Sequence, residues 1–166
     1  MIFAIGEQVG PYQIVAQLGR APEAVVLPVG HGTLLLGLAL GFKALRAAGV
    51  IATLPRLIGV QALNCAPLWA VAQYGRAGLG WVTEGETIAE GIRVVMPIRG
   101  DAVLAAITES GSSVAALDED RIRPAHAVLA AQGLFVEHTS ATIWPVLADT
   151  PGDVVGILTG HGLKTA

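Results

Sequence analysis

Residues 24–37 read Ala-Val-Val-Leu-Pro-Val-Gly-His-Gly-Thr-Leu-Leu-Leu-Gly, and this stretch decides the fold class. The valine-rich run over 24–29 is typical of a strand that a parallel sheet buries on both faces. Glycines follow at once, and the apolar run over 34–45 then has the length of a helix, with Gly49 as its stop. A buried strand, a glycine-rich turn and a helix in this order predict an α/β fold.

The same alternation continues along the chain. Strands are expected over residues 56–61, 113–117, 134–136 and 154–158, and helices over residues 12–18, 67–73, 101–110, 118–132 and 139–148. Asp101 is expected to cap its helix, Pro124 to kink or delay its helix, and Pro145 to interrupt the last one. Glycine-rich residues 75–85 are expected to form a loop. This order predicts a three-layer αβα domain over residues 1–166, with a mostly parallel sheet and right-handed crossovers.

The composition limits the classes of partner. Apolar residues make up 53% of the 166 residues and charged residues only 14%, so the chain is expected to cover apolar faces against a partner. The uncharged stretch 24–42 contains Pro28 and several glycines, which suit a turn better than a membrane span. A net charge of -3 without a basic cluster argues against nucleic acid. The single cysteine, Cys65, is expected to be a buried apolar residue of a cytoplasmic protein.

The turn formed by Gly30, His31, Gly32 and Thr33 has the design of a phosphate cradle. Glycines let backbone amides approach an anion, and the start of the next helix adds unpaired amides and a positive dipole end. Thr33 is expected to add a hydroxyl and to cap that helix. The turn does not fit the dinucleotide or P-loop fingerprints, and its spacing alone favours a phosphate site and a ligand-free turn equally.

A second glycine-rich turn, Thr159-Gly160-His161-Gly162, follows the last predicted strand. Ligands of open α/β sheets bind beyond the carboxyl ends of the strands, so the two turns are candidates for one shared site. A threonine hydroxyl there can donate to, or accept from, a ring nitrogen. The alternative is a loop that carries a solvent-facing histidine.

Several motifs in one order resemble the threonine synthases. They are PVGHGTLLLG (residues 28–37), LPRLIGVQA (54–62), ETIAEGI (86–92), GLFVEHTSA (133–141) and TGHGLK (159–164). The resemblance implies a fold-type-II pyridoxal phosphate enzyme and replacement or elimination at the β or γ position of an amino acid. It also implies cofactor-binding residues: Gly30, His31, Gly32, Thr33 and Leu34 at the phosphate, and Thr159 at the pyridine nitrogen.

The sequence also departs from the family. The family loop reads G-N-x-G-N or G-N-G-G-L, where this chain has His31 and Thr33, and His138 stands where the family has proline. The lysine that attaches the cofactor belongs to an upstream Ser-Phe-Lys-Asp-Arg motif in the family. The only lysines here are Lys43 and Lys164, and neither fits that role. We therefore expect the large-domain, C-terminal part of such an enzyme, without the lysine-bearing part and the small domain, with no catalytic residue of its own and no turnover alone.

Other functional classes stay open. The chain could be a non-catalytic interaction module, or a subunit that complements a separate N-terminal half. A generic nucleotide-binding domain lacks support, because residues 51–54 contain no acidic partner for a ribose. His126 is expected on the surface, while His31, His138 and His161 could converge at the strand ends, without the spacing of a metal site. A homodimer is the expected assembly.

Overall fold

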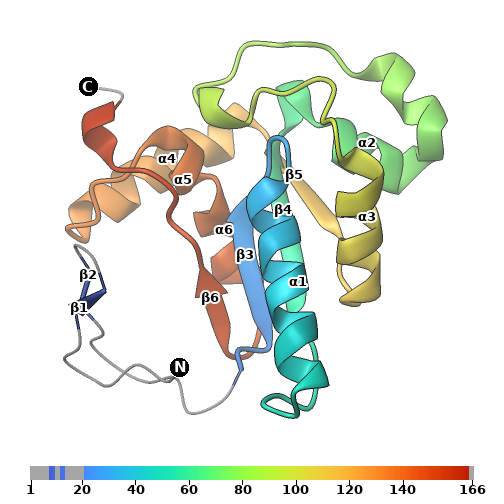
Figure 1. Ribbon diagram of the computed structural model, residues 1–166. Coiled ribbons are helices and arrows are strands. Elements are labelled where there is room, and N and C mark those ends of the chain that lie inside the picture. Colours follow the sequence, from blue (N-terminus) through green and yellow to red (C-terminus); the bar gives the residue numbers. More distant parts are fainter. Residues whose placement is uncertain (1–7, 10–11, 14–20, 165–166) are drawn as a thin grey trace.

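A four-stranded parallel sheet with helices on both faces forms the body of the molecule (Figure 1). The computed structural model describes residues 8–9, 12–13 and 21–164. The strand order is β5-β4-β3-β6, and the strands are β3 (Ala24–Pro28), β4 (Arg56–Ala62), β5 (Val114–Leu117) and β6 (Val154–Gly156). In the register of the sheet, Ala24 lies beside Arg56 on one side and Val154 on the other.

The helices follow the predicted alternation. They are α1 (Thr33–Ala47), α2 (Pro67–Tyr74), α3 (Gly100–Glu109), α4 (Glu119–Ala131), α5 (His138–Ala141) and α6 (Ile143–Asp149). Short 3₁₀ turns are η1 (Leu63–Cys65), η2 (Gly75–Trp81), η3 (Glu90–Ile92) and η4 (Gly162–Lys164). Strands β1 (Gln8–Val9) and β2 (Tyr12–Gln13) form a separate antiparallel pair.

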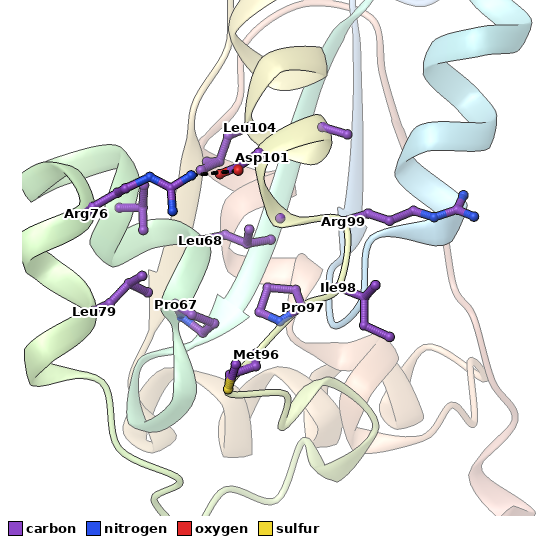
Figure 2. Close-up of a pocket in the computed structure, with 13 residues that line it drawn as sticks. Pro67, Leu68, Arg76, Leu79, Met96, Pro97, Ile98, Arg99, Asp101 and Leu104 are labelled. Carbon is purple, nitrogen blue, oxygen red and sulfur yellow. Dashed lines mark hydrogen bonds and ion pairs between the residues drawn. The ribbon is translucent and has the colours of Figure 1, made fainter.

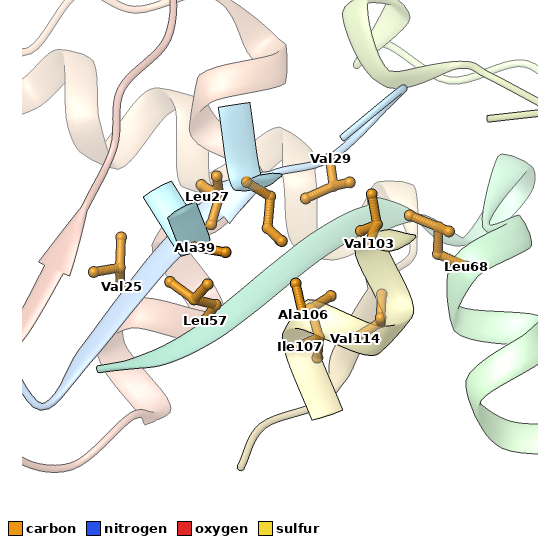
Figure 3. Packing of buried hydrophobic residues seen from close by; sticks show 11 residues of the cluster. Val25, Leu27, Val29, Ala39, Leu57, Leu68, Val103, Ala106, Ile107 and Val114 are labelled. Carbon is orange, nitrogen blue, oxygen red and sulfur yellow. The ribbon is translucent and has the colours of Figure 1, made fainter. Parts of the chain in front are cut away.

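Alternating side chains of β3 build two cores, one on each face of the sheet. Val25 and Leu27 pack with residues of α1 and α3, such as Leu35 and Ile107 (Figure 3). Ala24 and Val26 point to the other face, where α4 and α6 contribute Ile122 and Ile143. A strand that is covered on both faces must be apolar at every position, so the predicted three-layer αβα class is confirmed.

Local chemistry decides where several helices start and stop. The Asp118 side chain accepts a hydrogen bond from the Arg121 amide at 3.0 Å and caps α4, so Pro124 does not delay the start of that helix. The prediction that Asp101 caps α3 is wrong. The Gly100 amide already bonds the Pro97 carbonyl at 3.0 Å, so the helix begins one residue earlier and Asp101 lies in its first turn.

Three further expectations are wrong in detail. Tyr12 and Gln13 are paired in β2 instead of forming a helix, and residues 14–18 of that prediction lie outside the described residues. Residues 75–81 form 3₁₀ turns rather than an irregular loop. The last helical region breaks at Thr142, because Pro145 sits in the first turn of α6, where no amide donor is needed.

The predicted strand over residues 134–136 is reduced to one antiparallel bridge, between Val136 and His161. Among the described residues, no helix has both the length and the apolar character that crossing a membrane requires.

Candidate functional site

The glycine-rich turn lies at the carboxyl end of β3 and opens directly into α1. Gly32 is the residue before the helix, and its φ of 83° is a left-handed conformation that favours glycine. A side chain at this position would also overlap Cγ2 of Val103 on α3. The backbone of the turn therefore lies directly against α3, which only a glycine permits.

The first turn of α1 leaves amides available for an anion. The first hydrogen bond of the helix ladder joins the Leu36 amide to the Gly32 carbonyl at 3.0 Å. The amides of Thr33, Leu34 and Leu35 precede that ladder and have no intrahelical acceptor. Thr33 does not cap the helix, contrary to the prediction, because the capping position belongs to Gly32, and the Thr33 side chain is exposed. This end of α1 has the geometry that binds phosphate groups in other proteins.

His31 is exposed at the tip of the turn. Within the described part of the chain it makes no hydrogen bond, ion pair or ring contact. Its position thus leaves the imidazole available to a ligand at the turn, as the prediction requires, and shows no structural role for it.

Gln61 holds the turn from below and is fully buried. Its Nε2 donates to the Val29 carbonyl at 3.2 Å, one residue before Gly30. Its Oε1 accepts the amides of Leu68 and Trp69, at 2.9 and 3.1 Å, and so satisfies the first turn of α2. One buried amide side chain therefore joins β4, α2 and the glycine-rich turn over residues 30–33, here called the phosphate turn after its predicted ligand. The sequence did not predict this role of Gln61.

A loop segment covers the turn from above. A side chain at Gly30 would lie 3.3 Å from the Gly91 carbonyl and 3.2 Å from Val94. The Gly91 amide in turn donates to Thr139 Oγ1 at 3.1 Å. The segment that contains η3 thus connects the phosphate turn to α5.

Ser140 of α5 anchors the second predicted turn. Its Oγ is buried and accepts the amides of Thr159 and Gly160, each at 2.9 Å, and lies 3.1 Å from Thr159 Oγ1. Ser140 belongs to one of the motifs quoted above, but the sequence predicted no role for it. The signal that could have found it is a buried hydroxyl beside a glycine-rich turn.

Hydrogen-bond accounting assigns the direction of the bond between the two hydroxyls. A serine oxygen has two acceptor sites, and the two amides use both of them. Ser140 must therefore donate its own proton, either to Thr159 Oγ1 or to the Gly160 carbonyl at 3.3 Å. In both cases Thr159 keeps its hydroxyl proton, which is then free to be donated to a ring nitrogen.

The two turns share one edge of the sheet, because β3 and β6 are neighbours and parallel. The connection between them runs through Gly91 and Thr139, which is the residue next to Ser140. The structure therefore places the predicted cofactor residues in one region but assigns the support of that region to residues that the sequence did not indicate.

The histidines do not converge as expected. His138 stacks on His126 with ring centroids 4.2 Å apart, and His161 meets the ring of Phe135 edge-on at 5.6 Å. His126 is half-buried, and its Nε2 donates to the Val136 carbonyl at 3.0 Å. Its predicted position on the surface is therefore wrong. Burial, followed by the charges of His126 and Arg123, lowers the pKa of His138.

Cys65 and Lys43 are two further side chains for which the sequence made a prediction. Cys65 is fully buried. Burial, followed by the nearby Glu84 carboxylate, raises the pKa of its thiol, so the thiol stays neutral and packs as a small apolar side chain. Lys43 forms an ion pair with Glu109 at 2.6 Å, between α1 and α3. Lys43 is thus held at the far end of α1 from the phosphate turn, and the predicted charge at a helix end is what the structure shows.

With this geometry, the chain can be compared with known proteins. The family model "Pyridoxal-phosphate dependent enzyme" matches residues 3–160, and the chain belongs to this family. The cofactor of the family is pyridoxal phosphate. Both ends of the site fit that group, since the first turn of α1 offers unpaired amides to a phosphate and Thr159 offers a hydroxyl proton.

Among curated relatives, the chain is 35% identical to the threonine synthase of Mycobacterium leprae, over 96% of this chain and 44% of the relative. It is 31% identical to the threonine synthase of Methanocaldococcus jannaschii, over 96% of this chain and 42% of the relative. The chain therefore spans less than half the length of these relatives.

Solved structures confirm the fold. A threonine deaminase from T.th. matches with a TM-score of 0.66 and 26% identity, over 86% of this chain and 45% of that one. Maize serine racemase matches with a TM-score of 0.64 and 19% identity, over 85% of this chain and 43% of that one. The chain thus has the αβα core of a fold-type-II enzyme.

Proposed function

We propose that this chain is the cofactor-binding, C-terminal part of a threonine synthase-like lyase, which eliminates or replaces groups at the β or γ position of an amino acid. The observation that carries the proposal is the support of Thr159 by Ser140, because it leaves a free hydroxyl proton in the turn that follows β6, and β6 is the neighbour of β3 in the sheet. The similarity to threonine synthases supports the reaction class.

Each residue has a task in this proposal. The turn from Gly30 to Leu34 binds the cofactor phosphate through backbone amides, and the positive end of α1 stabilises the anion. The Thr159 hydroxyl would donate a hydrogen bond to the pyridine nitrogen, and the nitrogen would then stay largely unprotonated. A carboxylate at this position would favour a positively charged ring instead. When bound, the cofactor supplies the electron sink for chemistry at the carbon atoms of the amino acid.

The attachment of the cofactor is the task that this chain leaves to another segment. Attachment needs a lysine that is desolvated near the site, whereas Lys43 is 40% exposed and paired with Glu109. We infer that residues 1–166 are large-domain core and that the lysine-bearing part and the small domain belong to the remainder of the full enzyme. The chain alone is then inactive on amino acids.

An absorbance spectrum tests this proposal. The purified chain is mixed with pyridoxal phosphate and measured before and after borohydride. We expect no fixed adduct, together with protection against thermal unfolding by phosphate and by the cofactor. A band at roughly 410–420 nm that borohydride converts into a covalent adduct would show a competent lysine and refute the proposed inactivity of the chain alone. Absence of any protection would refute the phosphate site.

The second candidate is a subunit that complements a separate N-terminal half. The outer face of α1 favours it, because Leu34, Leu40 and Leu45 are 44%, 68% and 41% exposed on a helix whose two buried residues are Leu35 and Ala39. A helix that is apolar on all sides is normally covered by protein on all sides. A homodimer is the default form of the chain by itself, and light scattering on a gel-filtration column measures it.

A further inference from the structure

A cavity separate from the phosphate turn lies between α2 with η2 on one side and the start of α3 on the other (Figure 2). Its volume of about 520 Å³ falls within the range of small-molecule sites. Most of its wall is apolar. The apolar lining residues that matter here are Pro67, Leu68, Val71, Leu79, Met96 and Pro97.

One ion pair joins the two walls. Arg76 Nη2 of η2 lies 2.7 Å from Asp101 Oδ2 of α3, and both side chains are largely exposed. Arg76 retains further N–H donors, and Asp101 Oδ1 accepts no hydrogen bond from a described residue. A positive and a negative group, each with unused hydrogen-bonding atoms, therefore lie side by side at an apolar cavity.

The rim also favours a carboxylate. Arg99 also lines the cavity and forms no ion pair with a described residue. Together with Arg76 and Asp101, the lining therefore carries two positive side chains and one negative side chain. Figure 2 shows the Arg99 side chain extending away from Arg76. The amides of Asp101 and Ala102 precede the hydrogen-bond ladder of α3, which starts with the Val103 amide and the Arg99 carbonyl.

Both walls of the cavity also support the phosphate turn. Leu68 donates its amide to Gln61, and Gln61 donates to the Val29 carbonyl. On the other side, α3 also carries Val103, which does not line the cavity but packs where a side chain of Gly32 would lie. A displacement of α2 or α3 is thus transmitted to the turn through one buried hydrogen-bonded side chain and one tight packing contact.

We propose that this cavity binds an α-amino acid with an apolar side chain, and that the ligand acts on the phosphate turn through α2 and α3. The apolar side chain fills the space beside Leu68 and Val71. The carboxylate binds Arg76, and the ammonium binds the free oxygen of Asp101. This site goes beyond the proposed cofactor function and involves none of its binding residues.

Titration of the ¹⁵N-labelled chain with L-leucine, followed by NMR, tests the proposal. We expect saturable shifts of the amides of residues 67–71 and 96–104, with a dissociation constant on the order of 1 mM for so small a ligand. The amides of Gly30 and Gly32 should follow the same curve. The Arg76→Gln variant should weaken binding about three- to tenfold, because it keeps much of the length of the side chain but removes a charge-assisted bond.

Matched ligands and a matched variant make the result decisive. Arg46→Gln removes an exposed arginine at the far end of α1 and should leave binding unchanged. Leucinamide, without the carboxylate, and 4-methylpentanoate, without the ammonium, should both bind more weakly. No saturable shift up to about 20 mM overturns the site. Binding of these two analogues as tight as that of L-leucine overturns the ligand class, and saturation without shifts at Gly30 and Gly32 overturns the action on the turn.

Discussion

Substitution of Gly32 by alanine tests the close approach of the phosphate turn to α3. A residue with a side chain in the left-handed conformation costs about 1–2 kcal/mol, and the overlap with Val103 adds about 1–3 kcal/mol of overpacking. The Gly32→Ala variant should therefore lose about 2–5 kcal/mol of unfolding free energy. Urea denaturation followed by circular dichroism measures this loss.

Gly37 provides the matched control for this prediction. It lies within α1, the helix that starts directly after Gly32, and a side chain there would meet no atom within 4 Å. Gly37→Ala should stabilise the chain by about 0.5–1 kcal/mol, because glycine is a poor helix residue. The same glycine-to-alanine change should thus lower the unfolding free energy at position 32 and raise it at position 37.

A double variant keeps the argument testable if Gly32→Ala does not fold, since a domain of this kind has only about 5–15 kcal/mol to lose. Combining Gly32→Ala with Val103→Ala removes the overlap but keeps the backbone cost. The double variant should be more stable than the sum of the two single losses implies, by about 1–3 kcal/mol. Equal stability of Gly32→Ala and Gly37→Ala, or strict additivity in the double variant, would refute the packing argument.

Three further predictions concern the support of the site. Ser140→Ala leaves the amides of Thr159 and Gly160 without their acceptor, so it should cost about 1–3 kcal/mol, and hydrogen exchange of these two amides should become at least about tenfold faster. Because the pKa of Cys65 is raised above the ordinary 9.0, the unfolded chain loses this proton first, and stability should fall as the pH rises above 9. Because the pKa of His138 is lowered below 6.5, the unfolded chain gains this proton first, and stability should fall as the pH decreases below 6.5. Urea midpoints across the pH range measure both effects.

Each of these three has its own control. Ser113→Ala replaces an exposed serine outside the site and should leave exchange at residues 159–160 unchanged. Cys65→Ala should remove the loss of stability above pH 9, and an equal loss in this variant would assign the effect to other groups. His138→Phe keeps a ring against His126 but cannot take up a proton. An unchanged acid dependence in that variant would contradict the role of His138.

The sequence by itself determined the fold class and the position of the glycine-rich turn that we propose binds phosphate. Strand β3 is buried on both faces, so its residues had to be apolar at every position. The result is a continuous apolar stretch before Gly30 that can be recognised in the sequence. The helix after it has the length and the glycine stop that local rules describe. These features depend on neighbours in the chain, which is why they could be predicted.

Only the tertiary structure decided what supports the site. Gln61, Thr139 and Ser140 act on residues 32, 48 and 19 positions away along the chain, so no local pattern assigns them a partner. The separation of the histidines into a stacked pair and an edge-on contact likewise depends on how α4 packs against α5 and against the segment before it. The physical reason is that a buried hydrogen bond is satisfied by whichever group the packing of the sheet and helices brings within reach, and residue type alone does not name that group.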